Sequence, residues 1–212
     1  MRRALMLKAA KEVFAEKGYG KSTLDEIAQR AEFGKGTLYN YFPEGKEGLL
    51  FAIFDELFDE LENLIQESFG GDRLSQGTFR ATMEAFIHGY VGFFEERENL
   101  FFILLKEAHR MCFGENMEHF PYFRKQRIRM LNALKVPIQQ AIAAGWLRDV
   151  NPIMAAHMVL HNMEGLQVHM LMERYAGGDA AEASMDMADA SSFLTNMLLD
   201  GFALPAASDT SD

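Results

Sequence analysis

Hydrophobic residues recur at intervals of three and four along most of the chain, which is the spacing of helices that bury one face. Glycines and prolines interrupt this pattern at several points, and clusters of β-branched residues are scarce. We therefore expect an all-α protein of about nine helices. The pattern predicts helices at about 3–17, 24–31, 35–42, 46–69, 75–96, 98–111, 118–145, 152–175 and 184–203.

The segment 22–46 predicts two short helices joined by a tight turn. Thr23 and Glu26 form an S/T-x-x-E capping box, so a helix should begin at about residue 24. In the second short helix, Leu38 and Phe42 are four residues apart and should both face inward. The outer side of this helix then carries hydrogen-bonding groups, as expected of a helix that enters the major groove of DNA.

This segment resembles the DNA-binding region of TetR-family transcriptional regulators, whose pattern combines TxxxIA, KGTLYxYF and a following KExL. Here the three parts begin at Thr23, Lys35 and Lys46. The family usually has Gly-Val-Ser in the turn, whereas this chain has Glu32-Phe33-Gly34, and we expect Gly34 to take a conformation that a Cβ would strain. The resemblance covers about the first fifty residues. It implies an N-terminal three-helix head with a helix-turn-helix, followed by a helical domain that binds a ligand and dimerises.

The resemblance also implies which side chains meet DNA, and their chemistry agrees. Ammonium and phenol groups suit phosphate oxygens, an asparagine can pair with adenine, and a glycine lets a base approach closely. The alternative is that the tyrosines pack inside the head. The expected contacts are to phosphates from Lys35, Tyr39, Tyr41 and Lys46, with Thr23 at the start of the preceding helix, and to base edges from Gly36, Thr37 and Asn40.

Charge is divided unevenly along the chain. The net charge is −10, but residues 1–48 carry +2 and residues 49–212 carry −12, so the acidic part should repel DNA and help to orient the molecule. The single cysteine, Cys112, cannot form an internal disulfide, which fits the cytoplasm. No apolar run is long enough to span a membrane. We expect a DNA-binding domain at 1–48, an effector-binding and dimerisation domain at 49–204, and a disordered tail at 205–212.

Aromatic and methionine side chains are abundant between residues 86 and 163, in the middle of the domain where the resemblance implies a cavity for a small, largely apolar or aromatic effector. The same residues could simply fill a core. The residues predicted to bind the effector are Phe86, His88, Tyr90, Phe94, Phe102, Phe123, Met130, Met158, Asn162 and Gln167.

The last two predicted helices are strongly apolar and contain small residues, and family members pair through their last two helices. We therefore predict a homodimer, with intramolecular packing as the alternative. The predicted interface residues are His161, Gly165, Leu166, Met170, Phe193 and Met197.

A second hypothesis comes from His157, His161 and Glu164, which share one helix face and lie within reach of one metal ion. It describes a metal-binding helical-bundle protein or enzyme. We favour the first hypothesis, a non-enzymatic regulator without cofactor, resident metal or catalytic residues. Most members of this family are repressors. The protein should bind a near-palindromic double-stranded DNA operator as a homodimer and be released by its effector.

Overall fold

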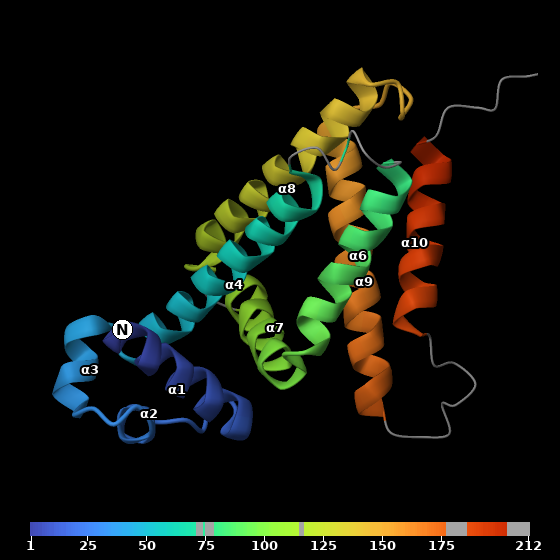
Figure 1. The fold of residues 1–212 in the computed structure, drawn as a ribbon. Coiled ribbons are helices and arrows are strands. Elements are labelled where there is room, and N and C mark those ends of the chain that lie inside the picture. Colours follow the sequence, from blue (N-terminus) through green and yellow to red (C-terminus); the bar gives the residue numbers. More distant parts are fainter. Residues whose placement is uncertain (71–73, 75–78, 115–116, 177–185, 203–212) are drawn as a thin grey trace, which may run out of the picture. The chain divides into compact units, whose positions relative to one another are not determined.

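The computed structural model describes residues 1–70, 74, 79–114, 117–176 and 186–202. Within these residues all regular structure is helical, and the predicted all-α fold is confirmed (Figure 1). The nine helices of the described residues are α1 (Arg2–Lys17), α2 (Leu24–Arg30), α3 (Lys35–Tyr41), α4 (Lys46–Phe69), α6 (Phe79–Glu95), α7 (Glu98–Phe113), α8 (Phe120–Ala143), α9 (Pro152–Ala176) and α10 (Met187–Phe202).

Most helix boundaries fall within two residues of the sequence prediction. Gly18 ends α1 with a φ of 77°, and its N–H donates to the carbonyl oxygen of Phe14. The last helix begins at Met187, three residues later than expected. The predicted helical residues 75–78 and the predicted tail 205–212 lie outside the described residues.

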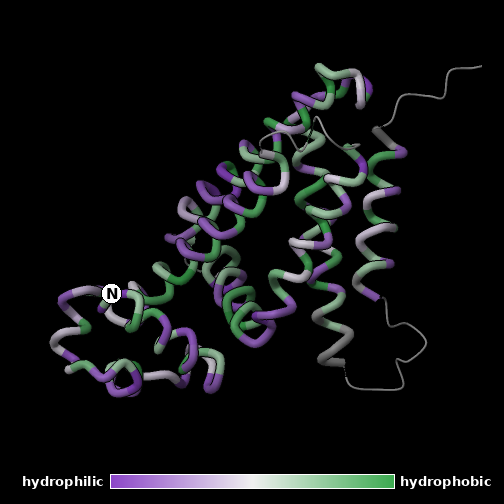
Figure 2. The backbone as a smooth tube through the Cα atoms, viewed as in Figure 1, coloured by the Kyte–Doolittle hydropathy of each residue, from purple (hydrophilic) through white to green (hydrophobic). Residues whose placement is uncertain are grey.

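The helices form two compact units. The first unit comprises residues 1–60 and 97–126, and the second comprises residues 61–96 and 127–212. These units are defined by packing alone, so the functional boundary that we expect after residue 48 stays a prediction. Figure 2 shows hydrophilic and hydrophobic positions alternating along the helices of both units, as expected of helices that each bury one face.

The core of the first unit extends beyond the three predicted head helices. Buried apolar residues of α1, α2, α3 and the first half of α4 form one cluster, and Leu104 and Met111 of α7 belong to that same cluster. A seven-residue helix is not stable by itself, so α3 depends on this core for its shape and position. The head is therefore held in place partly by α7.

In the second unit, α6 packs against both α9 and α10, and α9 also contacts α10 (Figure 1). The guanidinium of Arg80 on α6 donates to Asn196 at 2.5 Å and to Asp200 at 2.6 Å, both on α10. Buried polar residues on α10 are satisfied locally, since the Thr195 hydroxyl donates to the carbonyl oxygen of Ser191 at 2.8 Å. In the part of the chain that the structure describes, none of the helices is long and apolar enough to cross a membrane.

Candidate nucleic-acid interface

The capping box predicted at the start of α2 is present. The Thr23 hydroxyl accepts the N–H of Glu26 at 3.3 Å, and the Glu26 carboxylate accepts the N–H of Thr23 at 3.0 Å. The second carboxylate oxygen of Glu26 accepts the Lys17 ammonium at 2.6 Å. These bonds, that of Lys17 first, lower the pKa of Glu26 below its ordinary value.

The turn between α2 and α3 is closed by backbone hydrogen bonds that also end α2. The Phe33 N–H donates to the Ala28 carbonyl at 2.9 Å and the Glu32 N–H to the Gln29 carbonyl at 3.1 Å, which together form a Schellman motif. The residue in the left-handed region is Glu32, with a φ of 60°. Gly34 has a φ of −70°, which any residue can adopt, so our expectation that a Cβ would strain its conformation is wrong.

Helix α3 buries one side and exposes the other. Leu38 and Phe42 are buried in the core of the first unit, as predicted. Tyr39 and Tyr41 are 43% and 42% exposed, which excludes the alternative that both pack inside the head. The Lys35 ammonium is exposed and pairs with the Asp25 carboxylate at 2.9 Å, and this pairing raises the pKa of Lys35. Phenol and ammonium groups therefore lie on the outer side of α3.

The residues predicted to meet base edges lie on the same helix. Asn40 is exposed, and Thr37 is half-buried. Gly36 is exposed in the first turn of α3, and a Cβ added there would meet no heavy atom within 4 Å among its neighbours. Packing within the protein thus gives no reason for this glycine, although a glycine weakens a helix. Close approach of the helix surface to a base pair would be a reason for glycine at this position.

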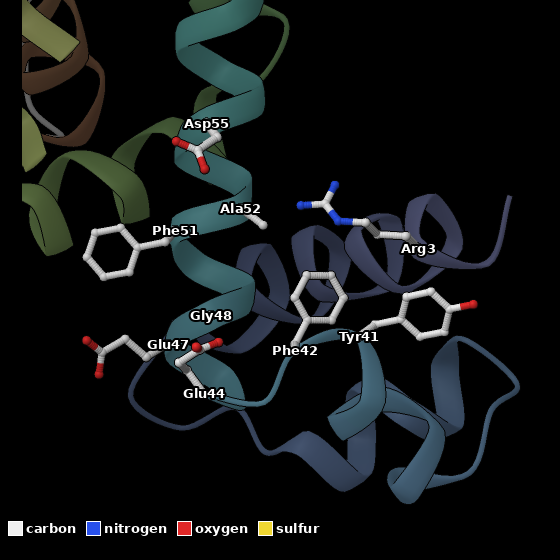
Figure 3. Close-up of a pocket in the computed structure, with 9 residues that line it drawn as sticks. All are labelled: Arg3, Tyr41, Phe42, Glu44, Glu47, Gly48, Phe51, Ala52 and Asp55. Carbon is white, nitrogen blue, oxygen red and sulfur yellow. The ribbon is translucent and has the colours of Figure 1, made fainter. Parts of the chain in front are cut away.

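A groove of about 420 Å³ lies beside the end of α3 (Figure 3). The Arg3 guanidinium lies 5.4 Å from the centre of the Phe42 ring, and the Tyr41 hydroxyl points away from α4. Two acidic side chains of the groove make internal bonds, since Glu47 pairs with His119 at 3.0 Å and Asp55 accepts the Tyr122 hydroxyl at 2.8 Å. Its lining is too acidic for a phosphate, and consists of Arg3, Tyr41, Phe42, Glu44, Glu47, Gly48, Phe51, Ala52 and Asp55.

A short helix with exposed hydroxyl, amide and ammonium groups, whose Leu38 and C-cap Phe42 are buried in the core of the first unit, is typical of a helix-turn-helix DNA-binding protein. Residues 6–53 match the sequence profile of the family described as "Bacterial regulatory proteins, tetR family". These residues therefore form a DNA-binding domain of the TetR type, and the comparisons support the class predicted from the sequence, a TetR-family transcriptional regulator.

Relatives and solved structures agree with this assignment. The chain is 27% identical over 169 residues to the uncharacterized HTH-type transcriptional regulator YhgD of Bacillus subtilis, covering 75% of this chain and 78% of that protein. Its fold is similar to that of FadR from Bacillus subtilis, solved with stearoyl-CoA, with a TM-score of 0.71, 20% identity and coverage of 94% and 99% of the two chains. It is also similar to SmeT of Stenotrophomonas maltophilia, solved with triclosan, with a TM-score of 0.71, 22% identity and coverage of 96% and 92%.

The predicted effector-binding residues are divided between the two units. Phe102 is exposed and Phe123 half-buried in the first unit, and His88 and Met158 are exposed in the second. The Asn162 amide donates to the Met158 carbonyl at 2.7 Å. The buried members, all in the second unit, are Phe86, Tyr90, Phe94, Met130 and Gln167.

Two of these buried residues are polar. Burial raises the pKa of Tyr90 well above its ordinary value, and the nearby Glu164 carboxylate raises it further, so the phenol stays protonated. Gln167 is 5% exposed, and its Nε2 finds no hydrogen-bond partner among the described residues. An unpaired buried amide has a free energy cost that a bound acceptor group would remove.

The metal-binding alternative is not supported. The Arg127 guanidinium donates to both Glu164 carboxylate oxygens at 3.0 Å, and its second nitrogen lies 2.6 and 3.0 Å from the ring nitrogens of His161. A fixed positive charge between these groups opposes the binding of a cation. No group of three potential ligands placed to hold a metal ion is found in the described ranges.

The predicted interface residues lie on α9 and α10, two helices of the second unit. Phe193 and Met197 on α10 are 62% and 60% exposed, and His161 and Gly165 on α9 are exposed as well. Leu166 and Met170 are half-buried. Large apolar side chains exposed in a row are unusual for a monomer.

Two polar residues near these sites, Tyr19 and Arg127, were not predicted from the sequence. Tyr19, whose carbonyl accepts the Lys46 ammonium at 2.8 Å and whose ring centre lies 4.5 Å from it, had no signal beyond its position between Gly18 and Gly20. Arg127 had no signal, because its bonds to Glu164 and His161 depend on the packing of α8 against α9.

Proposed function

We propose that this protein is a ligand-responsive repressor that binds a near-palindromic operator as a homodimer and is released from it by a small, largely apolar or aromatic molecule. The observation that carries the DNA-binding part is the exposed side of α3. We assign phosphate contacts to Lys35, Tyr39 and Tyr41, and base-edge contacts to Gly36, Thr37 and Asn40, with Thr23 beside the backbone.

The homodimer is supported by the apolar stripe of α9 and α10. We define this stripe by Met154, Met158, Phe193 and Met197, which are all at least half exposed. A second copy that covers the stripe brings two heads to one operator, with recognition helices one helical turn of about 34 Å, or a multiple of it, apart. We assign Met158, expected from the sequence to line the effector site, to this interface because half of its surface is exposed.

The effector site is proposed in the second unit, around the aromatic series of α6 and the buried amide of α9. Ring centres are 6.4 Å apart for Phe86 and Tyr90 and 5.0 Å apart for Tyr90 and Phe94. These rings suit an apolar ligand, and Gln167 supplies a donor for a carbonyl or ether oxygen. FadR and SmeT, which share the fold, were solved with stearoyl-CoA and triclosan, and both compounds contain apolar parts and oxygen acceptors.

Release requires that the effector bind one conformation more tightly than the other. A preference worth a few kcal/mol is enough to change operator occupancy strongly. The protein needs no catalytic group for this role, and a regulator of bacterial genes works in the cytoplasm, where the chromosome lies.

Selection of bound sequences from a pool of random DNA duplexes tests the proposal directly. The expected result is an enriched inverted repeat whose half-sites are centred about one helical turn, or a multiple of it, apart. A screen of stearoyl-CoA, free stearate and triclosan for loss of binding to that repeat then tests the effector class. Enrichment of a single, non-repeated site, or of no sequence at all, would contradict the dimeric operator.

A further inference from the structure

The ammonium group of Lys46, which the sequence motif assigns to a DNA phosphate, points into the protein. Nζ donates to the carbonyl oxygens of Tyr19 at 2.8 Å and of Ser22 at 3.0 Å. It also lies 4.5 Å from the centre of the Tyr19 ring, within the range of a cation–π interaction. We infer that Lys46 is a positioning residue, which fastens the loop 18–22 to the start of α4 and does not bind a phosphate. This inference rests on the proposed DNA-binding function.

Of the two carbonyl groups that Lys46 contacts, that of Ser22 depends on the ammonium as its donor, whereas that of Tyr19 also accepts the Ser22 N–H at 3.3 Å. Ser22 is 3% exposed, so its carbonyl would lie away from water if the ammonium left. A buried carbonyl without a donor has a free energy cost comparable to a lost hydrogen bond. A phosphate could therefore attract the ammonium outward only by breaking bonds that the folded loop needs.

The local charges also favour the inward position. Lys46 is the first residue of α4, and the positive end of a helix dipole disfavours a cation there unless other groups offset it. Two carbonyl oxygens and the face of an aromatic ring provide that offset. Burial raises the pKa of Tyr19, and the carboxylates of Glu47 and Glu107 raise it further against the opposing charge of Arg110, so the surroundings of this ring are negative on balance.

The loop held by Lys46 leads directly into the helix-turn-helix. The Ser22 hydroxyl donates to the Gly18 carbonyl at 2.6 Å and lies 3.3 Å from the Val13 carbonyl, which fixes the loop to the end of α1. Thr23, the N-cap of α2, is the next residue. Lys46 and Ser22 together thus connect the end of α1, the start of α2 and the start of α4, and fix the direction from which α2 and α3 extend.

The test compares Lys46→Met with Lys35→Met in the full chain. Affinity for a fluorescein-labelled duplex of random sequence is measured by anisotropy over a series of KCl concentrations. Each lost phosphate contact reduces the slope of log K against log salt by about 0.9. We expect Lys35→Met to reduce the slope by this amount per protomer. Lys46→Met should leave the slope unchanged while weakening binding by the same factor at every salt concentration.

Thermal unfolding without DNA is the second readout. Lys46→Met should lower the midpoint by about 2–4 °C or more, whereas Lys35→Met, at an exposed site, should leave it nearly unchanged. If Lys46→Met does not fold, Lys46→Gln, which keeps a neutral donor, replaces it and should also keep the wild-type slope.

The inference is overturned if a Lys46 variant reduces the salt slope as Lys35→Met does and keeps the wild-type midpoint, because Lys46 would then be a phosphate ligand. It is also overturned if Lys46→Met changes neither affinity nor midpoint. A wild-type chain that binds no DNA at low salt would refute the DNA-binding function itself, and the inference with it. That outcome differs from the first two, in which the wild-type chain binds.

Discussion

A single residue, Gly36, should affect both the stability of the protein and its binding to DNA. Among the described residues, no atom lies within 4 Å of a Cβ added at this position, so Gly36→Ala should strengthen α3. We expect an increase of about 0.5–1 kcal/mol in the free energy of unfolding together with weaker operator binding, because the added methyl group meets a base pair. Thermal unfolding and anisotropy measure the two effects.

The matched control for Gly36→Ala is Gly89→Ala in α6, where an added Cβ would make an ordinary contact of 3.6 Å with Leu64. This control should also stabilise its helix but leave operator affinity unchanged. If the Gly36→Ala protein is more stable and binds DNA as well as the wild type does, DNA does not approach the helix closely at Gly36.

Glu26 makes the stability of the head depend on pH. Its folded-state pKa lies below the ordinary value of 4.5, so its contribution to stability is present above that value and is lost as the pH falls through the folded-state pKa. Glu26→Gln keeps an acceptor for the Thr23 N–H but removes the charge that attracts Lys17.

Between about pH 6 and about pH 3, the unfolding midpoint of the wild type should therefore fall further than that of Glu26→Gln. Calorimetry at each pH measures this difference. Parallel curves for the two proteins would show that the carboxylate contributes nothing in this range.

At the scale of the element, the end of α2 contains a residue that is poorly suited to its conformation. Glu32 has a φ of 60° at the position of a Schellman motif where glycine is usual. Glu32→Gly should raise the free energy of unfolding by about 1 kcal/mol, and the midpoint by about 2–4 °C.

Glu32→Ala is the control for this prediction, since it removes the same carboxylate but keeps the Cβ. It should give no such gain. Equal stabilisation by both variants in thermal unfolding would mean that charge, and not backbone conformation, is the cause.

The sequence predicted the helices well because their signals are local. The capping box of Thr23 and Glu26 and the spacing of Leu38 and Phe42 each involve residues a few positions apart. The turn was predicted less well, because glycine is a common but not a required residue at a left-handed position. The strained conformation expected at Gly34 is found at Glu32. The Lys46 bonds join residues 24 and 27 positions apart, and no local pattern reports them.

At the scale of the whole molecule, two copies must meet for two heads to bind one operator. Phe193→Asp or Met197→Asp adds a charge to an exposed apolar site of α10. The homodimer should dissociate, because its formation would bury that charge away from water without a partner. Light scattering after size-exclusion chromatography should give a monomer mass for these variants and a dimer mass for the wild type.

Val136→Asp is the control for dissociation, because Val136 is an exposed apolar residue on α8, outside the proposed interface. It should remain dimeric. A wild-type chain that elutes as a monomer at all concentrations, or Asp variants that remain dimers, would exclude α9 and α10 as the interface.

The proposed function requires that the exposed side of α3 bind DNA, with Tyr39 positioning the helix and Asn40 selecting the sequence. The most direct measurement is the affinity of Asn40→Ala and Tyr39→Phe for the selected operator and for a scrambled duplex. We expect Tyr39→Phe to weaken both by a similar factor of about 2–10. Asn40→Ala should weaken the operator alone, by about tenfold or more. Equal losses on both duplexes for both variants, or no loss for either, would show that Tyr39 and Asn40 do not have these separate roles in DNA binding.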